Sequence, residues 1–136
     1  MNREALFCDG TGDYVIPPEP SENGKIVLRF RTAHNDVEEV NILTGGRSHA
    51  MRKTCSMGEF DYYEIVCQLG RDPFEYAFEI KKGDQICFYN RCGVCEHEEP
   101  YYAFRIVPGF STPEWAKGAV MYQIFVDRFY NGDPDN

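Results

Sequence analysis

The chain has no long hydrophobic run, no cluster of basic residues and only one tryptophan. No segment approaches the roughly 20 apolar residues of a membrane-spanning helix, and no apolar stretch follows a basic N-terminus as in an export signal. We therefore expect a soluble protein without a membrane partner. The net charge of −8 argues against a nucleic-acid partner, because phosphate binding needs clustered lysine and arginine.

The six cysteines admit two interpretations. In a secreted domain they would form three disulfides, but without an export signal free, reduced thiols are the expected state. With 43% hydrophobic and 15% aromatic residues, a chain of this length can form a core without covalent cross-links. Because reduced thiols are typical of the cytoplasm, we expect a cytoplasmic location. The cysteines are Cys8, Cys55, Cys67, Cys87, Cys92 and Cys95.

Apolar and polar residues alternate with period two in several short segments, which is typical of strands with one face on a core. The clearest cases are residues 74–80 and 25–31. Turns rich in Gly, Pro, Asn and Asp separate the segments at intervals of about 8 to 15 residues. The pattern predicts an all-β, immunoglobulin-like antiparallel β-sandwich. Further apolar residues predicted to share an inward face are Val40 with Ile42, Tyr63 with Ile65 and Cys67, and Ile86 with Phe88.

The last part of the chain has a different character. Residues 113–118 form a short helical or turn-like lead, and residues 119–125 are apolar enough for a strand buried on both faces. Such a strand needs parallel neighbours, yet only a polar loop follows it. We therefore expect two units, a sandwich over residues 1–112 and the truncated start of a second domain over residues 113–136.

These segments carry a family resemblance. Pro-Glu-Trp-Ala-Lys at 113–117, Val-Met-Tyr-Gln-Ile-Phe-Val-Asp-Arg-Phe at 120–129 and Asn-Gly-Asp-Pro at 131–134 resemble the entry into the catalytic (β/α)8 barrel of the α-amylase family. The resemblance is to its cyclomaltodextrinase, neopullulanase and maltogenic amylase branch. Upstream, Asn-Asp-Val at 35–37, Met-Arg-Lys-Thr at 51–54 and Phe-Asp-Tyr-Tyr at 60–63 resemble that branch's N-terminal domain, carbohydrate-binding module family 34.

The resemblance implies a function for the parent enzyme and a different one for this chain. The parent would hydrolyse α-glucosidic bonds with retention, using carboxylates on later barrel strands. The resemblance places all of these beyond Asn136, so we expect this chain to have no catalytic residues and not to be an enzyme itself. It would bind malto-oligosaccharides or cyclodextrins and mediate homodimerisation by packing over the barrel of a partner subunit. The alternative is a purely structural interaction sandwich without affinity for sugar.

Tyrosines are the candidate sugar contacts, because their amphipathic rings stack on pyranose faces. The adjacent pair Tyr62 and Tyr63 must face opposite sides of its strand, so we expect one in the core and one exposed. For any single tyrosine, packing in a core or interface competes with ligand contact. His49 follows the Gly45-Gly46 turn in a segment that, by resemblance, reaches a partner's active site. The full set of candidate substrate-binding residues is Tyr62, Tyr63, Tyr89, Tyr101, Tyr102 and His49.

Two groups of side chains are candidate metal sites. Oxygen-bearing side chains at Asn131, Asp133 and Asn136 suit calcium, although an Asx-rich turn has the same composition. The resemblance implies a structural calcium at this loop, completed by ligands further along the parent enzyme. The thiols and imidazole of Cys87, Cys92, Cys95 and His97 would suit zinc, but one isolated Cys-x2-Cys is a weak signal and zinc is not expected.

Overall fold

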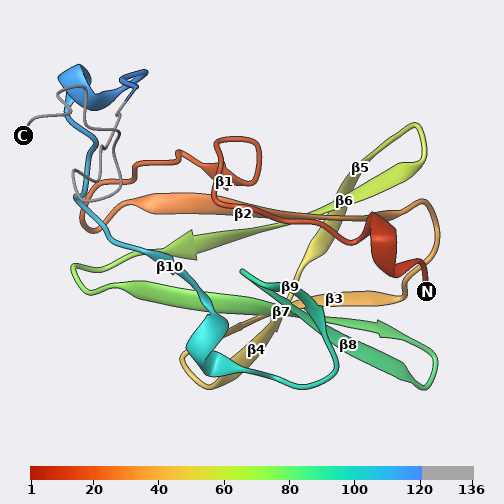
Figure 1. Ribbon diagram of the computed structural model, residues 1–136. Coiled ribbons are helices and arrows are strands. Elements are labelled where there is room, and N and C mark those ends of the chain that lie inside the picture. Colours follow the sequence, from red (N-terminus) through yellow and green to blue (C-terminus); the bar gives the residue numbers. More distant parts are fainter. Residues whose placement is uncertain (121–136) are drawn as a thin grey trace, which may run out of the picture.

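The computed structural model describes residues 1–120, which form two antiparallel sheets packed face to face (Figure 1). One sheet has the strand order β1-β2-β6-β5 and the other β4-β3-β7-β8-β9, with β10 paired to the first residues of β7. Within the described residues the helical elements are short 3-10 turns, and no helix is long and apolar enough to cross a membrane. The strands are β1 (Val15–Ile16), β2 (Lys25–Ala33), β3 (Glu39–Thr44), β4 (Arg47–Ala50), β5 (Arg52–Met57), β6 (Phe60–Gln68), β7 (Phe74–Lys82), β8 (Gln85–Asn90), β9 (Gly93–Cys95) and β10 (Phe104–Ile106), and the 3-10 turns are η1 (Arg3–Ala5), η2 (Pro100–Tyr102) and η3 (Glu114–Ala116).

The core lies between the two sheets and is centred on aromatic side chains. Phe30 on β2 and Phe78 on β7 have no exposed surface, and their ring centroids are 4.6 Å apart. Burial alternates along both strands, as the period-two pattern predicted. The immunoglobulin-like sandwich expected from the sequence is therefore confirmed.

Strand β8 corrects one prediction about side-chain direction. Ile86 and Phe88 were expected to face inward, but Ile86 is 47% exposed, whereas Cys87 and Tyr89 are buried. The register explains the difference, because Cys87 and Tyr89 pair with core-facing residues of β7. Directly opposed residues in an antiparallel pair share a face of the sheet, so the residues opposite Phe78 and Ile80 enter the core.

Strands β4 and β5 were not predicted from the sequence. Every residue in both is exposed, so neither shows the alternation that marks a strand with one buried face. Between them, buried Met51 donates its N–H to the Val40 carbonyl, and the chain passes from one sheet to the other. The preceding turn uses Gly45 and Gly46, whose φ angles of 57° and 72° suit glycine.

The short lead expected at residues 113–118 contains η3. Of the strand expected over residues 119–125, only the first two residues belong to the described part of the chain.

Candidate functional site

Two tyrosines of the described residues are exposed, and they are neighbours. Tyr101 is 81% exposed and Tyr102 is 37% exposed. Both belong to η2, where Pro100 occupies the first position and fixes a helical φ. Because a 3-10 turn has three residues per turn, the three side chains point in different directions. The two rings meet edge to face with centroids 5.1 Å apart.

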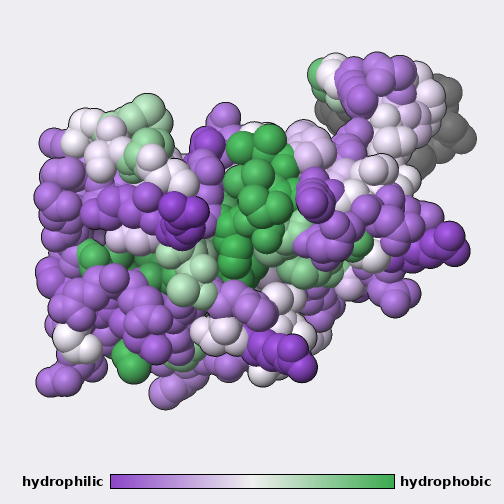
Figure 2. All heavy atoms as spheres, turned by 180° about the vertical axis from the view of Figure 1, so that it is seen from behind, coloured by the Kyte–Doolittle hydropathy of each residue, from purple (hydrophilic) through white to green (hydrophobic). Residues whose placement is uncertain are grey.

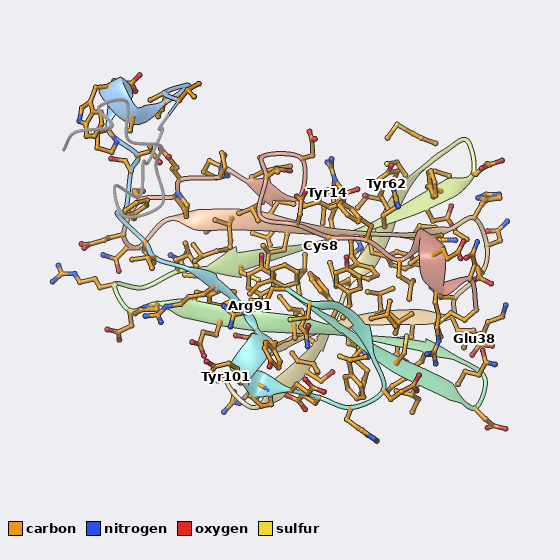
Figure 3. The ribbon with its side chains drawn as sticks, in the orientation of Figure 1. Cys8, Tyr14, Glu38, Tyr62, Arg91 and Tyr101 are labelled. Carbon is orange, nitrogen blue, oxygen red and sulfur yellow. The ribbon has the colours of Figure 1, made fainter. Side chains whose placement is uncertain are left out.

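Arg91, in the β8–β9 turn, holds this pair against the sandwich. Its guanidinium carbon lies 5.8 Å from the Tyr101 ring centroid and 5.7 Å from that of Tyr102. It also donates to the Tyr101 carbonyl at 3.3 Å, and its backbone N–H donates to the Tyr102 carbonyl at 3.1 Å. Figure 3 shows Arg91 and Tyr101 close together beside η2. Arg91 was not among the sequence candidates, because only the fold brings the hairpin turn to η2.

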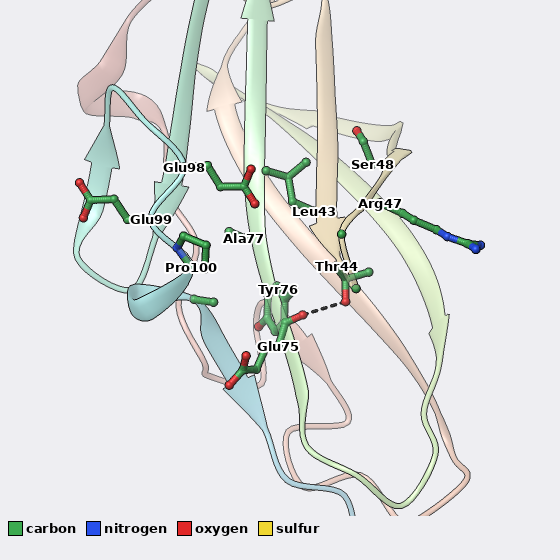
Figure 4. A pocket seen from close by; sticks show the side chains of 13 residues that line it. Leu43, Thr44, Arg47, Ser48, Glu75, Tyr76, Ala77, Glu98, Glu99 and Pro100 are labelled. Carbon is green, nitrogen blue, oxygen red and sulfur yellow. Dashed lines mark hydrogen bonds between the residues drawn. The ribbon is translucent and has the colours of Figure 1, made fainter.

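A groove of about 420 Å³ lies next to η2, between residues 98–100 and the β3–β4 turn. Leu43, Ala77 and Pro100 form apolar parts of its lining. The Glu98 side chain points towards Leu43, whereas Glu99 and Arg47 point away (Figure 4). An apolar surface with a few polar groups around it is typical of small-molecule sites, and a carboxylate accepts hydrogen bonds from sugar hydroxyls.

The remaining candidate sugar contacts lie elsewhere. Tyr63 is 6% exposed and Tyr89 is 7% exposed, so both are core residues whose ring faces are closed to a ligand in this structure. Tyr62 is partly buried on the outer face of β6 beneath Arg29. His49 is exposed on β4, opposite Ile42 of β3. The structure therefore brings together only Tyr101 and Tyr102 of the six predicted residues.

The described residues include only one of the two candidate metal clusters, the Cys87, Cys92, Cys95 and His97 group for which zinc is not expected. Asn131, Asp133 and Asn136 lie outside the described residues. Within residues 1–120, no group of three or more His, Cys, Asp or Glu side chains is placed to hold a metal ion. Cys87 points into the core, where its sulfur contacts that of Met1 at 3.4 Å, and burial raises the pKa of its thiol. All six cysteines are free thiols.

A polar cluster around Asp61 was not predicted from the sequence. The Asp61 carboxylate, 1% exposed, accepts from Ser56 Oγ at 2.6 Å, and Lys53 Nζ is 2.8 Å away. It also accepts from the Asn35 N–H at 2.8 Å and lies 2.8 Å from His34 Nδ1. The three upstream segments that resembled the family thus meet here, one residue from each. Since the carboxylate is enclosed by its partners, this cluster has a structural role.

The two antiparallel sheets, packed face to face, define an immunoglobulin-like domain. The sequence model described as "Alpha amylase, N-terminal ig-like domain" matches residues 1–107. This chain belongs to that family.

Individual relatives agree with this assignment. The chain is 30% identical to Neopullulanase 2 of Thermoactinomyces vulgaris over 152 residues, covering 100% of this chain and 25% of the relative. It is also 30% identical to a cyclomaltodextrinase of Geobacillus thermopakistaniensis, covering 98% of this chain and 26% of the relative. Among solved structures, a cyclomaltodextrinase superposes with a TM-score of 0.70 at 24% identity, covering 100% of this chain and 25% of that one. The chain thus spans about a quarter of the length of these relatives.

Proposed function

We propose that this chain is the non-catalytic N-terminal domain of an α-amylase-family glycoside hydrolase of the cyclomaltodextrinase and neopullulanase kind, and that it binds α-glucan. The match of the family model to residues 1–107 carries the proposal. The parent enzyme would act on cyclodextrins, pullulan or malto-oligosaccharides. A relative named as an intracellular maltogenic amylase supports a cytoplasmic location.

Tyr101 is the proposed glucan contact. Its ring is the most exposed tyrosine ring of the described residues, and sugar stacking needs an open aromatic face. Arg91 limits the movement of the ring, so less conformational entropy is lost on binding. From this ring, a bound glucan would extend over Pro100 into the groove, where Glu98 accepts hydrogen bonds from hydroxyl groups.

The test is a titration of this chain with maltoheptaose and β-cyclodextrin, followed by NMR. We expect dissociation constants of roughly millimolar to high-micromolar size, because one stacked ring buries little area. Tyr101→Ala should weaken binding about fivefold to tenfold. Trp115→Ala is the matched control, because Trp115 is also 81% exposed but lies in η3. If neither sugar shifts Tyr101 or its neighbours at millimolar concentration, the domain does not bind glucan.

A subunit contact is the second proposed role, and an exposed hydrophobic surface favours it. Hydrophobic side chains form a band across the rear of the molecule (Figure 2). Strand β5 pairs with β6 only as far as Glu64, and just beyond that point Val66 is 65% exposed. Exposed apolar side chains beside a free strand edge are typical of association sites. We propose that this part of β6 contacts a second copy of the protein.

Sedimentation measurements test the subunit contact. Val66→Lys should reduce any concentration-dependent association, because it places a charge on the contact surface. Met57→Lys is the control, since Met57 is 57% exposed in the β5–β6 turn. Equal association of the two variants would rule out this part of β6. A chain that neither binds sugar nor associates would remove both proposed roles.

A further inference from the structure

The segment that follows β10 lies against the loop between β1 and β2. Two backbone N–H groups of this exit segment make the contact. Gly109 donates to the Pro20 carbonyl at 2.9 Å, and Thr112 donates to Glu19 Oε1 at 3.1 Å. The exit segment is thus attached to the sandwich at two points after its last strand has ended.

Both oxygens of the Glu19 carboxylate face the exit segment. Oε1 accepts from Thr112, and Oε2 lies 3.9 Å from Nζ of Lys117. Lys117 is in turn 2.9 Å from the Glu114 carboxylate in η3. The Thr112 hydrogen bonds are the main reason that the pKa of Glu19 is below its ordinary value. Glu19 therefore links the β1–β2 loop to the exit segment at two residues, Thr112 and Lys117.

The sequence on both sides of this contact suits a fixed geometry. Glu19 stands between Pro18 and Pro20, and proline restricts the backbone of the loop. Gly109 has a φ angle of 80°, and an ideal Cβ there would lie 3.0 Å from Cγ of Glu22. Only glycine combines this backbone conformation with so close an approach. The exit segment is consequently held closely against the loop.

We propose that Glu19 is a positioning residue that fixes the direction in which the chain leaves the sandwich. Strand β10 has only three residues, and its pairing ends at Ile106 opposite Phe74. Without Glu19, the hydrogen bond from Gly109 to Pro20 would be the one hydrogen bond left between this loop and the described part of the exit segment. In a longer enzyme, which the proposed function assumes, Glu19 would set how this domain is oriented relative to the segment that follows.

Amide hydrogen exchange of this chain, followed residue by residue by NMR, tests the proposal. Glu19→Ala removes the acceptor for Thr112 and should raise its exchange rate roughly tenfold, the effect of losing one charge-assisted hydrogen bond. Glu19→Gln keeps an acceptor oxygen and should raise the rate less. Glu22→Ala is the control, because Glu22 lies beside Gly109 whereas the Thr112 N–H donates to Glu19, so it should leave Thr112 unchanged.

The direction of the exit segment is measured separately. For this, a spin label is attached at position 115 through Trp115→Cys, in a variant whose other cysteines are replaced by serine or alanine. The label should broaden the NMR signals of a defined set of amides in the loop. Glu19→Ala should spread that broadening over more of the molecule. Unchanged Thr112 exchange together with unchanged broadening would overturn the proposal. If Glu19→Ala does not fold, Glu19→Gln and Lys117→Met give the same comparison. Sugar titration is independent of all these readouts, so the two proposals can fail separately.

Discussion

The carboxylate of Asp61 lies 2.8 Å from the ammonium of Lys53, although Asp61 is almost fully buried and Lys53 is 37% exposed. Asp61 is the second residue of β6, and Lys53 belongs to β5. The same carboxylate accepts the N–H of Asn35 in the β2–β3 loop. One buried charge therefore joins three segments at one end of the sandwich, and its removal should be costly.

We expect Asp61→Asn to lower the free energy of unfolding by about 3 kcal/mol. The amide keeps the shape but leaves Lys53 without its ion-pair partner and places an NH2 group among donors. Urea denaturation measures the change. Glu64→Gln is the matched control on the same strand, because the Arg29–Glu64 pair is partly exposed and such pairs contribute about 1 kcal/mol or less. Equal losses for the two variants would show that burial gives Asp61 no special role.

The same carboxylate should make stability depend on pH. Burial alone would raise the pKa of Asp61, but hydrogen bonds from Lys53, Ser56 and Asn35 outweigh it and hold the pKa below its ordinary value. A carboxyl with a depressed pKa contributes stability above its unfolded pKa of about 3.9, and this contribution is lost as the pH falls towards the folded pKa. We expect denaturation midpoints to fall more steeply below about pH 5 in the native chain than in Asp61→Asn. Parallel pH curves would contradict this assignment.

Much of the fold could be predicted from the sequence, because β2 and β7 bury one face and so alternate in polarity. Strands β4 and β5 could not, since edge strands with every residue exposed carry no such signal. The face of β8 was predicted wrongly because Ile86 and Cys87 are both acceptable core residues, and only the register with β7 decides between them.

The sites were harder to predict than the fold. Tyr101 and Tyr102 stand out from the other candidate tyrosines through exposure, which depends on η2 and on Arg91 from a distant turn. The Asp61 cluster joins residues up to 27 positions apart, and an aspartate at a strand end looks like any solvated acid in the sequence. Both features depend on tertiary contacts that composition and spacing do not encode.

The cysteines should separate by reactivity towards an aromatic disulfide reagent. Cys55 and Cys92 are exposed, whereas Cys8 and Cys87 are buried, and burial raises the pKa of both buried thiols. Because the thiolate is the reactive form, Cys55 and Cys92 should react rapidly and Cys8 and Cys87 only after unfolding. Cys55→Ser should remove one rapidly reacting thiol. Rapid reaction of Cys8 in the folded chain would contradict the packing of the core.

Gly46→Ala should lower the free energy of unfolding by about 1 kcal/mol, because position 46 has a φ angle of 72° and a left-handed conformation is unfavourable for alanine. No atom lies within 4 Å of the added Cβ, so the loss comes from the backbone alone. Gly70→Ala is the matched control, since its Cβ is equally free and its φ is not left-handed. It should be neutral or slightly stabilising, because alanine reduces the entropy of the unfolded chain. Urea denaturation of both variants measures the difference, and equal stabilities would mean that the β3–β4 turn adopts another conformation in solution.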